Sequence, residues 1–225
     1  MPEGRITGLE PQKRARGRTN VYVEGRFAFG VSDEILARAG LRVGDILTAE
    51  IKARLLSEEA TRLVREKALR LLSTRERSRK ELFERLREGG ADEETIEQVL
   101  DRLEELAFLD DARFARAYAA GKRAAGWGDR RLVQELRRRG VARAVIEEAL
   151  ENLEGRLEDA ESVGRDTGGS ESVPDQLVGL IRRRYGQEFG RDPDRARRRA
   201  QGFLLRRGHD YEQIRRLLRE AFPDC

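Results

Sequence analysis

Residues 126–153 read GWGDRRLVQELRRRGVARAVIEEALENL, and this stretch decides the fold class. At helical spacing, Leu132, Val133 and Leu136 form one apolar stripe, and Gly140 ends the helix that carries it. A second stripe follows the glycine and consists of Ile146, Ala149, Leu150 and Leu153. The stretch therefore predicts two short helices joined by a tight turn.

The same pattern occurs three times along the chain, around Gly90, Gly140 and Gly208. In each copy a leucine precedes the glycine by four residues, and an isoleucine follows it by six. An apolar residue and a leucine then follow at nine and ten residues after the glycine. A unit this short buries its own apolar face poorly, so the copies must stack. The sequence predicts a mainly α protein of tandem three-helix repeats in an elongated array.

The composition excludes several classes of function. Of 225 residues, 38% are hydrophobic and 39% are charged, which is typical of a helical array with wide solvated faces. The single cysteine is Cys225, and the single histidine is His209, which we interpret as a turn residue. No cofactor, metal or enzyme activity is expected, because no phosphate-binding loop, His-Glu helix motif or nucleophile with a base is present. With no long apolar run, we expect a cytoplasmic protein that does not enter a membrane.

The N-terminal residues 1–56 are predicted to form a small module with a β-hairpin. Four apolar residues alternate across a Glu24–Gly25 turn, and Ile6 to Leu9 supply a third strand. The alternating residues are Val21, Val23, Phe27 and Phe29. Ser32 caps a short helix that Gly40 ends, and a further helix is expected over residues 48–56. Two interpretations stay open: a docking domain, or a lid on the first repeat.

The remainder divides into repeats at 57–108, 109–153 and 176–225, with an acidic flexible linker at 154–175. The first repeat begins with a helix from Ser57, its cap, to Leu72. The inner face of this helix is predicted to hold Leu63, Val64, Ala68, Leu69 and Leu72. Ser78 and Glu81 have the spacing of a capping box, and Asp92 caps the helix after it.

Paired aspartates open the second repeat, at Asp110 and Asp111. A carboxylate pair suggests a metal site, but these residues directly precede a helical pattern, which favours a helix N-cap. Trp127 lies between two glycines before Asp129, which is expected to cap the next helix. The tryptophan either fills the seam between helices or stacks on a partner.

The net charge of +4 is unevenly distributed, since the first 56 residues and the last 50 are basic while the linker is acidic. Of the 46 basic residues, 41 are arginine, a side chain suited to bidentate recognition of phosphate or carboxylate. The candidate binding residues lie in the second and third repeats. They are Arg123, Trp127, Arg130, Arg131, Arg137, Arg138, Arg139, Arg182, Arg183, Arg184, Arg197, Arg198 and Arg199. The second-repeat arginines are expected on the face away from Leu132 and Leu136. The basic run Lys13 to Arg18, in a predicted hairpin loop, is open to phosphate contact or to simple solvation.

Three segments closely resemble the RecX regulatory proteins of bacteria: ALRLLSTRERSRKEL (68–82), LDDARFARAY (109–118) and GWGDRRLVQELRRRGV (126–141). The resemblance covers roughly residues 60–222. It implies three tandem three-helix repeats and a modulator of the RecA recombinase in DNA repair, recombination and the SOS response. Such proteins bind the RecA filament on single-stranded DNA. We expect single-stranded DNA, and also double-stranded DNA, among the ligands of this chain. The resemblance also implies that such proteins depress ATPase and strand-exchange activity. We expect a monomer.

Two other classes of function stay open at this point. One is a stand-alone DNA-binding module, because a helix pair with a turn also describes helix-turn-helix proteins. Against it, helices that follow the turns, such as ADEETIEQVLDRLEEL (91–106), are acidic or mixed. The other is a helical scaffold that binds a protein without nucleic acid.

Overall fold

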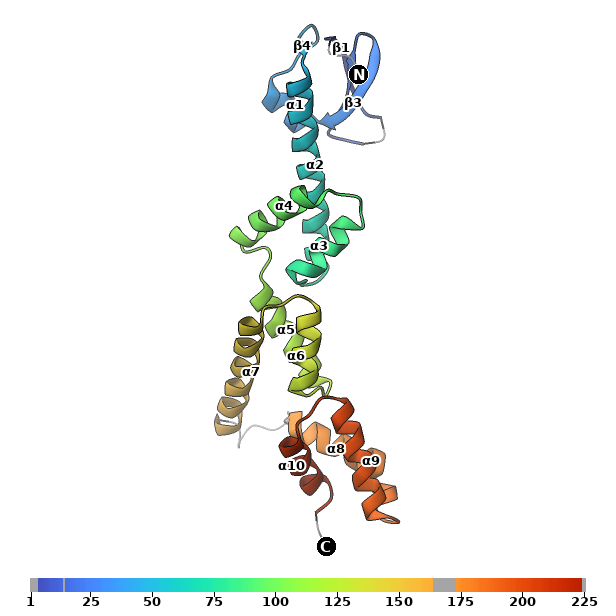
Figure 1. The fold of residues 1–225 in the computed structure, drawn as a ribbon, viewed down its shortest axis with the longest axis vertical. Coiled ribbons are helices and arrows are strands. Elements are labelled where there is room, and N and C mark those ends of the chain that lie inside the picture. Colours follow the sequence, from blue (N-terminus) through green and yellow to red (C-terminus); the bar gives the residue numbers. More distant parts are fainter. Residues whose placement is uncertain (1–3, 14, 164–172, 224–225) are drawn as a thin grey trace. The chain divides into compact units, whose positions relative to one another are not determined.

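The structure is a computed structural model that describes residues 4–13, 15–163 and 173–223, without the side chains of 154–163 and 173–174. The described residues form four strands and ten helices (Figure 1). The chain packs into two compact units: Met1–Thr74 with Leu82–Phe108, and Arg75–Glu81 with Leu109–Cys225. This confirms a mainly α protein with a small N-terminal sheet.

The N-terminal sheet is antiparallel and has the strand order β3-β2-β1-β4. Its strands are β1 (Gly4–Pro11), β2 (Arg18–Val23), β3 (Arg26–Ser32) and β4 (Ile46–Leu47). Side chains alternate between the two faces of a strand, and one face is packed against α1 (Asp33–Ala39) and the start of α2 (Ala49–Leu72). The core on that face comprises Ile6, Val21, Val23, Phe29, Val31, Ile35, Leu47 and Leu55.

Phe27 does not join this core, contrary to the alternation predicted from sequence. The register shifts between Val21 and Tyr22, so that Val21 pairs with Phe29 but Tyr22 pairs with Phe27. This β-bulge places Phe27 beside a residue of the opposite face. Phe27 is 60% exposed, and its ring meets that of Tyr22 edge to face with 6.0 Å between centroids.

Helix α2 is one continuous helix where the sequence predicted two, so the prediction of Ser57 as an N-cap was wrong. Thr48 is the cap, accepting a hydrogen bond from Ile51 N at 3.3 Å. The inner face is also narrower than predicted: Val64 and Ala68 are buried, whereas Leu63 and Leu69 are exposed. Strong helix formers on both sides of residue 57 keep the helix intact, since one internal serine costs little.

A buried carboxylate joins α2 to the sheet. Glu59 is 4% exposed, forms an ion pair with Arg18 at 2.5 Å and one with Arg62 at 2.9 Å, and accepts a hydrogen bond from Ser32 N at 3.0 Å. Burial opposes ionisation, but the bonds from Arg62 and Ser32 and the charge of Arg18 outweigh it and lower the pKa of Glu59. Arg18 of the basic run is therefore a structural residue.

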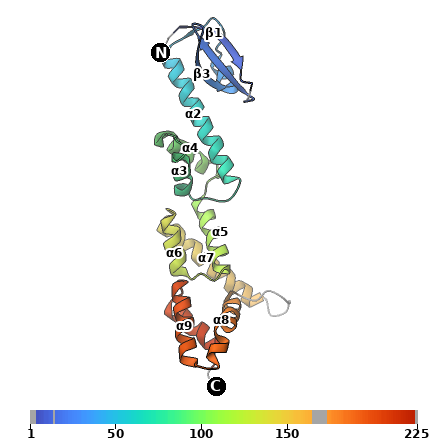
Figure 2. The same ribbon diagram turned by 90° about the vertical axis from the view of Figure 1, so that its right-hand side faces the viewer.

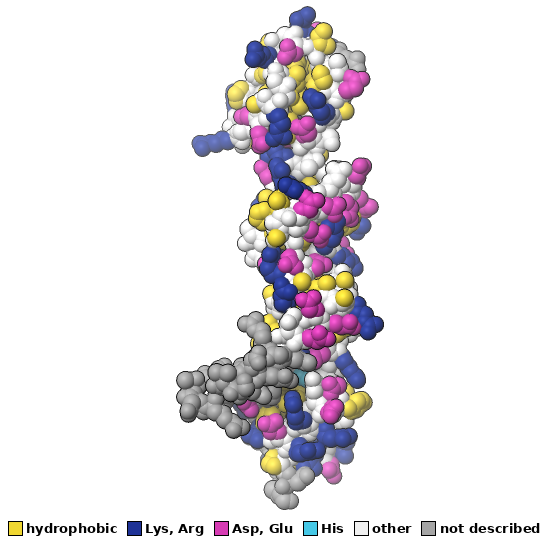
Figure 3. All heavy atoms as spheres, turned by 90° about the vertical axis from the view of Figure 1, so that its left-hand side faces the viewer, with side chains coloured by type: hydrophobic (Ala, Val, Ile, Leu, Met, Phe, Trp, Pro, Cys, Tyr) yellow, Lys and Arg dark blue, Asp and Glu magenta, His cyan; other side chains and the backbone are white. Residues whose placement is uncertain are grey.

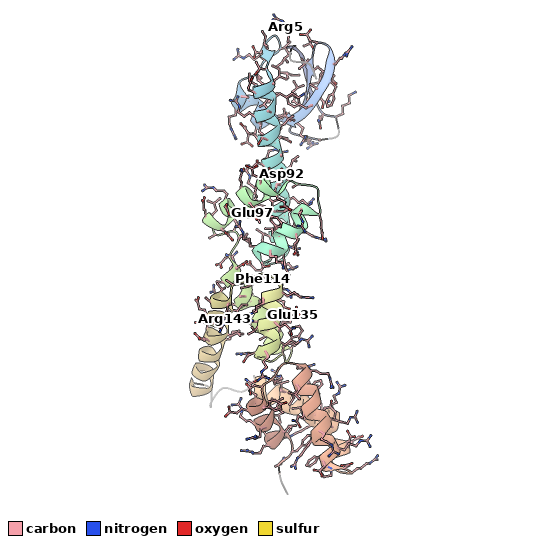
Figure 4. All side chains as sticks on the ribbon, in the orientation of Figure 1. Arg5, Asp92, Glu97, Phe114, Glu135 and Arg143 are labelled. Carbon is pink, nitrogen blue, oxygen red and sulfur yellow. The ribbon has the colours of Figure 1, made fainter. Side chains whose placement is uncertain are left out.

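The helices of the first repeat after α2 are α3 (Arg79–Arg87) and α4 (Glu93–Glu105). Asp92 caps α4 by accepting from Thr95 N at 2.8 Å, as predicted. Glu97, labelled in Figure 4, lies on α4. The buried residues of these two helices are Leu82, Leu86, Ile96, Val99, Leu100 and Leu103.

The second unit holds the second and third repeats, each with its own core. The second repeat comprises α5 (Asp111–Ala124), α6 (Asp129–Arg138) and α7 (Arg143–Val163), packed around Phe114, Leu136 and Ile146. The third comprises α8 (Val173–Phe189), α9 (Pro193–Arg206) and α10 (Tyr211–Ala221), packed around Ile181, Leu204 and Ile214. Figure 2 shows both groups of helices from a second direction.

The repeat pattern corresponds to one local structure. Gly90, Gly140 and Gly208 have φ of 84°, 82° and 86°, the left-handed conformation that ends a helix at low cost only for glycine. The leucines four residues earlier and the isoleucines six residues later are all buried.

The predicted linker is partly helical. Helix α7 extends to Val163 and α8 begins at Val173, so both ends of the 154–175 range lie within helices. Glutamate, leucine, arginine and alanine in EGRLEDAESV (154–163) favour a helix even without an apolar stripe. Residues 164–172 lie outside the described residues, and the full five-part division of the chain stays a prediction.

Two contact regions within the second unit join the end of one helix to the start of another. In the first junction, residues 78–81 meet Asp111 and residues 138–140. Ser78 Oγ donates to Arg139 O at 2.6 Å and accepts from Glu81 N at 3.2 Å. Asp111 accepts from Arg79 N at 2.7 Å, and burial of its carboxyl group raises the pKa of Asp111. The capping role of Ser78 is confirmed.

In the second junction, residues 125–130 meet residues 207–209. Gly128 N donates to Arg207 O at 2.8 Å, and Arg130 N donates to Gly208 O at 3.2 Å. These bonds satisfy amides at the start of α6 that have no partner within the helix. Asp129, predicted as the cap, is instead the first residue of α6, and Gly128 is a cap without a side-chain bond. His209 is 6% exposed, with Nε2 3.2 Å from Gly126 O.

Candidate functional site

The second repeat displays a row of alternating cations and aromatic rings along α5, α6 and the loop between them. The Arg131 guanidinium lies 3.8 Å from the centre of the Trp127 ring, and Lys122 Nζ lies 5.2 Å from it. Lys122 Nζ is also 5.5 Å from the Tyr118 ring, whose other cation, Arg139, is at 4.6 Å. We call Arg131, Trp127, Lys122, Tyr118 and Arg139 the cation–aromatic row. Each such contact contributes roughly 0.5–1 kcal/mol at an exposed site, so the row fixes the positions of its cations.

Two predicted site residues are occupied within the fold. Arg139 forms ion pairs with Glu81 at 3.1 Å and with Glu135 at 2.5 Å, and its side chain is only 23% exposed. Burial opposes its charged form, but the bond to Glu135 and nearby negative charge raise the pKa of Arg139. Arg123 pairs with Asp129, and its side chain is 13% exposed. These two arginines therefore have a structural role within the repeat.

The remaining second-repeat arginines are available at the surface of α6. Arg130 and Arg137 are exposed and have no ion pair with any residue that the structure describes. The side chain of Arg138 is 73% exposed, with Glu135 at 3.3 Å. Glu135 and Phe114 are labelled in Figure 4 on α6 and α5. Leu132 and Leu136 are fully buried, so these three arginines lie on the solvent side of α6.

The third repeat divides its arginines in the same way. Arg182 donates to Glu220 O at 2.7 Å and Arg197 to Phe222 O at 3.3 Å, at the carbonyl end of α10. Arg199 pairs with Glu188 at 2.8 Å, and the Arg184 guanidinium lies 5.1 Å from the Phe203 ring. In the described part of the chain, Arg183 and Arg198 are exposed without an ion pair.

Three further observations concern the paired aspartates, metal binding and membrane spans. Asp110 accepts from Ala112 N and Arg113 N at 2.8 and 2.9 Å, so it is the N-cap of α5. Among the described residues no cluster of His, Cys, Asp or Glu is arranged to hold a metal ion. Over the same residues no helix has the length and apolar character that a membrane span requires.

Four family models match the chain in sequence. They are described as the N-terminal domain of regulatory protein RecX (residues 4–48) and the first, second and third three-helix domains of RecX (65–103, 110–150 and 173–218). The regulatory protein RecX of Ectopseudomonas mendocina is 39% identical over 158 residues, which cover 69% of this chain and 93% of that protein. The chain belongs to the RecX family.

Other RecX proteins match more of the chain at lower identity. RecX of Clostridium botulinum is 27% identical over 217 residues, or 96% of each chain. A crystal structure of regulatory protein RecX superposes with a TM-score of 0.68 at 23% identity, covering 95% of this chain and 98% of that one. RecX from Lactobacillus salivarius gives a TM-score of 0.60 at 20% identity, covering 73% and 97%. The two structures support the fold.

In the RecX family scheme, the cation–aromatic row falls in the second three-helix domain, and sequence reasoning missed two of its members. Tyr118 and Lys122 are four residues apart on α5, a spacing that places them on one helix face. That spacing, next to a loop tryptophan, was the available signal.

A second omission concerns α10 of the third RecX domain. Its exposed side bears Arg215, Arg216 and Arg219, opposite the buried Ile214 and Leu217. In the view of Figure 3, Lys and Arg atoms gather over the part of the molecule formed by α8, α9 and α10. The polar face of this strongly amphipathic helix was the signal for these arginines.

Proposed function

We propose that this RecX-family protein regulates the RecA recombinase as an inhibitor. It binds the RecA filament on single-stranded DNA and depresses ATP hydrolysis and strand exchange. Family membership supports the regulatory role. The observation that carries the contact is the set of exposed arginines on α6, held beside the cation–aromatic row. Planar guanidinium groups suit carboxylates on a protein surface or phosphates of bound DNA.

The decisive measurement is DNA-dependent ATP hydrolysis by the cognate RecA, titrated with this protein at substoichiometric ratios. The parent is expected to inhibit well below one molecule per RecA. An Arg137→Ala/Arg138→Ala double variant should need roughly tenfold more protein, since two exposed charge pairs at about 0.7 kcal/mol each give that factor. Neither side chain packs in a core, so the variant should fold.

A matched control replaces two arginines outside the candidate surface. Arg85 and Arg102 have side chains 61% and 62% exposed, each paired with a glutamate three residues later on its own helix or just beyond it. Arg85→Ala/Arg102→Ala should inhibit as the parent does. Equal inhibition by the α6 variant would exclude the α6 arginines as the contact, and no inhibition by the parent would exclude the inhibitor function.

A stand-alone DNA-binding function is the second candidate, favoured by the arginines of the third repeat. Arg183, Arg198, Arg215, Arg216 and Arg219 are exposed on α8, α9 and α10. Each phosphate neutralised by such a residue releases counterions, so affinity should fall steeply as salt rises. DNA affinity that is strongly salt-dependent, together with no effect on RecA, would favour this function over the first.

A further inference from the structure

Among the described residues of the first unit, no helix packs against the second face of the N-terminal sheet. The helices α1 and α2 pack on the face that carries Ile6, Val21 and Val23. The other face carries the neighbours of these residues along each strand, among them Tyr22 on β2. We propose that this open face binds single-stranded DNA by stacking a base on the Tyr22–Phe27 pair.

The aromatic pair is the first observation. Phe27 is 60% exposed, so its ring contributes little to the protein core. Its ring and that of Tyr22 meet at 76° with centroids 6.0 Å apart, so the two rings present faces in different directions. Unpaired bases stack on exposed aromatic rings of this kind regardless of sequence, because every base has a π face.

Two glycines lie opposite β2 residues of the open face, and side chains of that face cover them. Gly8 pairs with Tyr22 across β1 and β2, and a Cβ at Gly8 would lie 3.5 Å from the Tyr22 ring. Gly30 pairs with Asn20 two residues further along β2. The Tyr22 ring therefore lies over Gly8, and the Gln12 side chain, which donates to Asn20 Oδ1 at 2.7 Å, lies over Gly30.

Charge complementarity favours a nucleic acid over an apolar peptide. Residues 4–48 contain eight basic and five acidic side chains, a net charge of +3. Arg5, labelled in Figure 4, is exposed on β1 next to the buried Ile6, which places it on the open face. Arg26 is exposed but pairs with the buried Val23 across the hairpin, so it lies on the covered face, opposite Phe27. A phosphate next to a base stacked on this pair would meet the Arg5 guanidinium, one nitrogen of which also donates to Gly44 O at 2.9 Å.

This inference rests on the proposed function in one respect, that the chain meets single-stranded DNA in its regulatory complex. It assigns a second contact, remote in sequence from the arginines of α6 and the third repeat. The test therefore measures DNA binding by the full chain without RecA, and RecA inhibition is measured separately.

The experiment uses fluorescence anisotropy of labelled oligo(dT) over a range of salt concentrations. Phe27→Leu keeps the apolar bulk but removes the π face, and Phe27→Ala removes both. Both should weaken binding about fivefold or more, because one stacked base contributes about 1 kcal/mol or more. The loss should be the same factor at every salt concentration, since stacking releases no counterions. An Arg5→Gln variant should instead reduce the slope of log affinity against log salt by about 0.7.

Two control variants are expected to leave the DNA affinity unchanged. Tyr22→Phe retains a ring and should bind as the parent does. Leu63→Ala removes an apolar side chain that is 43% exposed on α2, away from the sheet face, and should also leave affinity unchanged.

Photocross-linking to 5-iododeoxyuridine gives a readout independent of affinity. Adducts are expected in the tryptic peptides 19–26 and 27–38, which contain Tyr22 and Phe27. Unchanged affinity of both Phe27 variants, or adducts confined to residues 176–225, would overturn the inference. So would a loss of RecA inhibition by Phe27→Leu with DNA affinity intact, because the open face would then bind protein. Failure of the parent to inhibit RecA would refute the proposed function without affecting this test.

Discussion

The two junctions of the second unit solve one structural problem with different groups. Ser78 and Gly128 occupy the same repeat position, twelve residues before Gly90 and Gly140. Each meets the carbonyl of the residue before a helix-ending glycine, Arg139 O for Ser78 and Arg207 O for Gly128. Ser78 reaches its carbonyl with a hydroxyl group, whereas Gly128 uses its backbone amide. Without a side chain at position 128, the two backbones come close enough to bond directly.

The groups around the two junctions also differ in their chemistry. The first junction adds charged groups, with Arg139 between Glu81 and Glu135. The second adds bonds to main-chain carbonyls, from Arg207 to Ala125 O at 2.7 Å and from His209 to Gly126 O. The comparison teaches that the repeats conserve the geometry of the contact and vary its chemistry. It also predicts that the first junction is sensitive to pH and salt and the second to added bulk.

The largest expected effect comes from Gly128→Ala. A Cβ there would lie 2.4 Å from Gly208 C and from His209 N, and these backbone atoms cannot move aside as a flexible side chain can. Unfolding free energy, measured by urea denaturation, should fall by about 3 kcal/mol, at the upper end for overpacking. Amide hydrogen exchange should quicken in α8, α9 and α10.

The matched control is Gly121→Ala, because a Cβ at this helical position would meet no atom within 4 Å. It should stabilise the protein by up to about 1 kcal/mol, the difference in helix propensity between the two residues. If Gly128→Ala were as stable as the parent, the close backbone contact of the second junction would be disproved.

Ser78→Ala should have the next largest effect. It removes the hydroxyl that both caps Glu81 N and donates to Arg139 O, and it leaves that carbonyl without this donor in a buried setting. We expect a loss of about 1–2 kcal/mol in unfolding free energy. Ser57→Ala, at an exposed position inside α2, should change stability by less than about 0.5 kcal/mol. An equal loss in both variants would mean that the two bonds of Ser78 contribute no more than the hydroxyl of an exposed helical serine.

Local signals explain why much of the fold was predictable. A helix often ends at a glycine with positive φ. It often begins at a side chain that accepts a hydrogen bond from a backbone amide up to three residues later. Gly140, Ser32 and Asp92 could therefore be assigned from sequence. The apolar periodicity similarly identified the buried faces of α6 and α10.

The failures lie where distant residues decide the outcome. The bulge that exposes Phe27 depends on how two strands pair, and no residue in the hairpin marks it. The start of α6 is satisfied by carbonyls almost eighty residues away, so Asp129 only resembled a cap. At the candidate site, the sequence identified the arginines but could not separate Arg139, paired with Glu81, from the exposed Arg137, because that pairing is tertiary.

His209→Val tests the second junction with a smaller change. Val141, the equivalent residue of the second repeat, is buried at 4% exposure, so valine suits the position in shape. The variant loses the bond to Gly126 O and should lower the unfolding free energy by about 1 kcal/mol. Tyr211→Ala, 61% exposed in the first turn of α10, is the control and should be nearly neutral. A neutral His209→Val would mean that the main-chain bonds and the Arg207 side chain hold the junction without the His209 bond.

Glu135→Gln tests the ionic character of the first junction, and its expected effect is the smallest. The bond from Arg139, opposed by burial and assisted by the charges of Arg138 and Arg139, lowers the pKa of Glu135. A carboxylate with a lowered folded-state pKa stabilises the protein above its unfolded pKa, about 4.3, and loses that contribution as pH falls through the folded value. The parent should exceed the variant by at most about 1 kcal/mol at neutral pH, because both partners are partly exposed.

Two changes of condition separate the junctions. The gap between the parent and Glu135→Gln, followed by urea denaturation, should close below about pH 4. It should also shrink in about 1 M salt, where the screening length is only about 3 Å. The deficit of Gly128→Ala should persist under both conditions, because it arises from overlap of uncharged atoms. A Glu135→Gln gap that is constant from neutral to acid pH would mean that the charge of Glu135 does not stabilise the first junction.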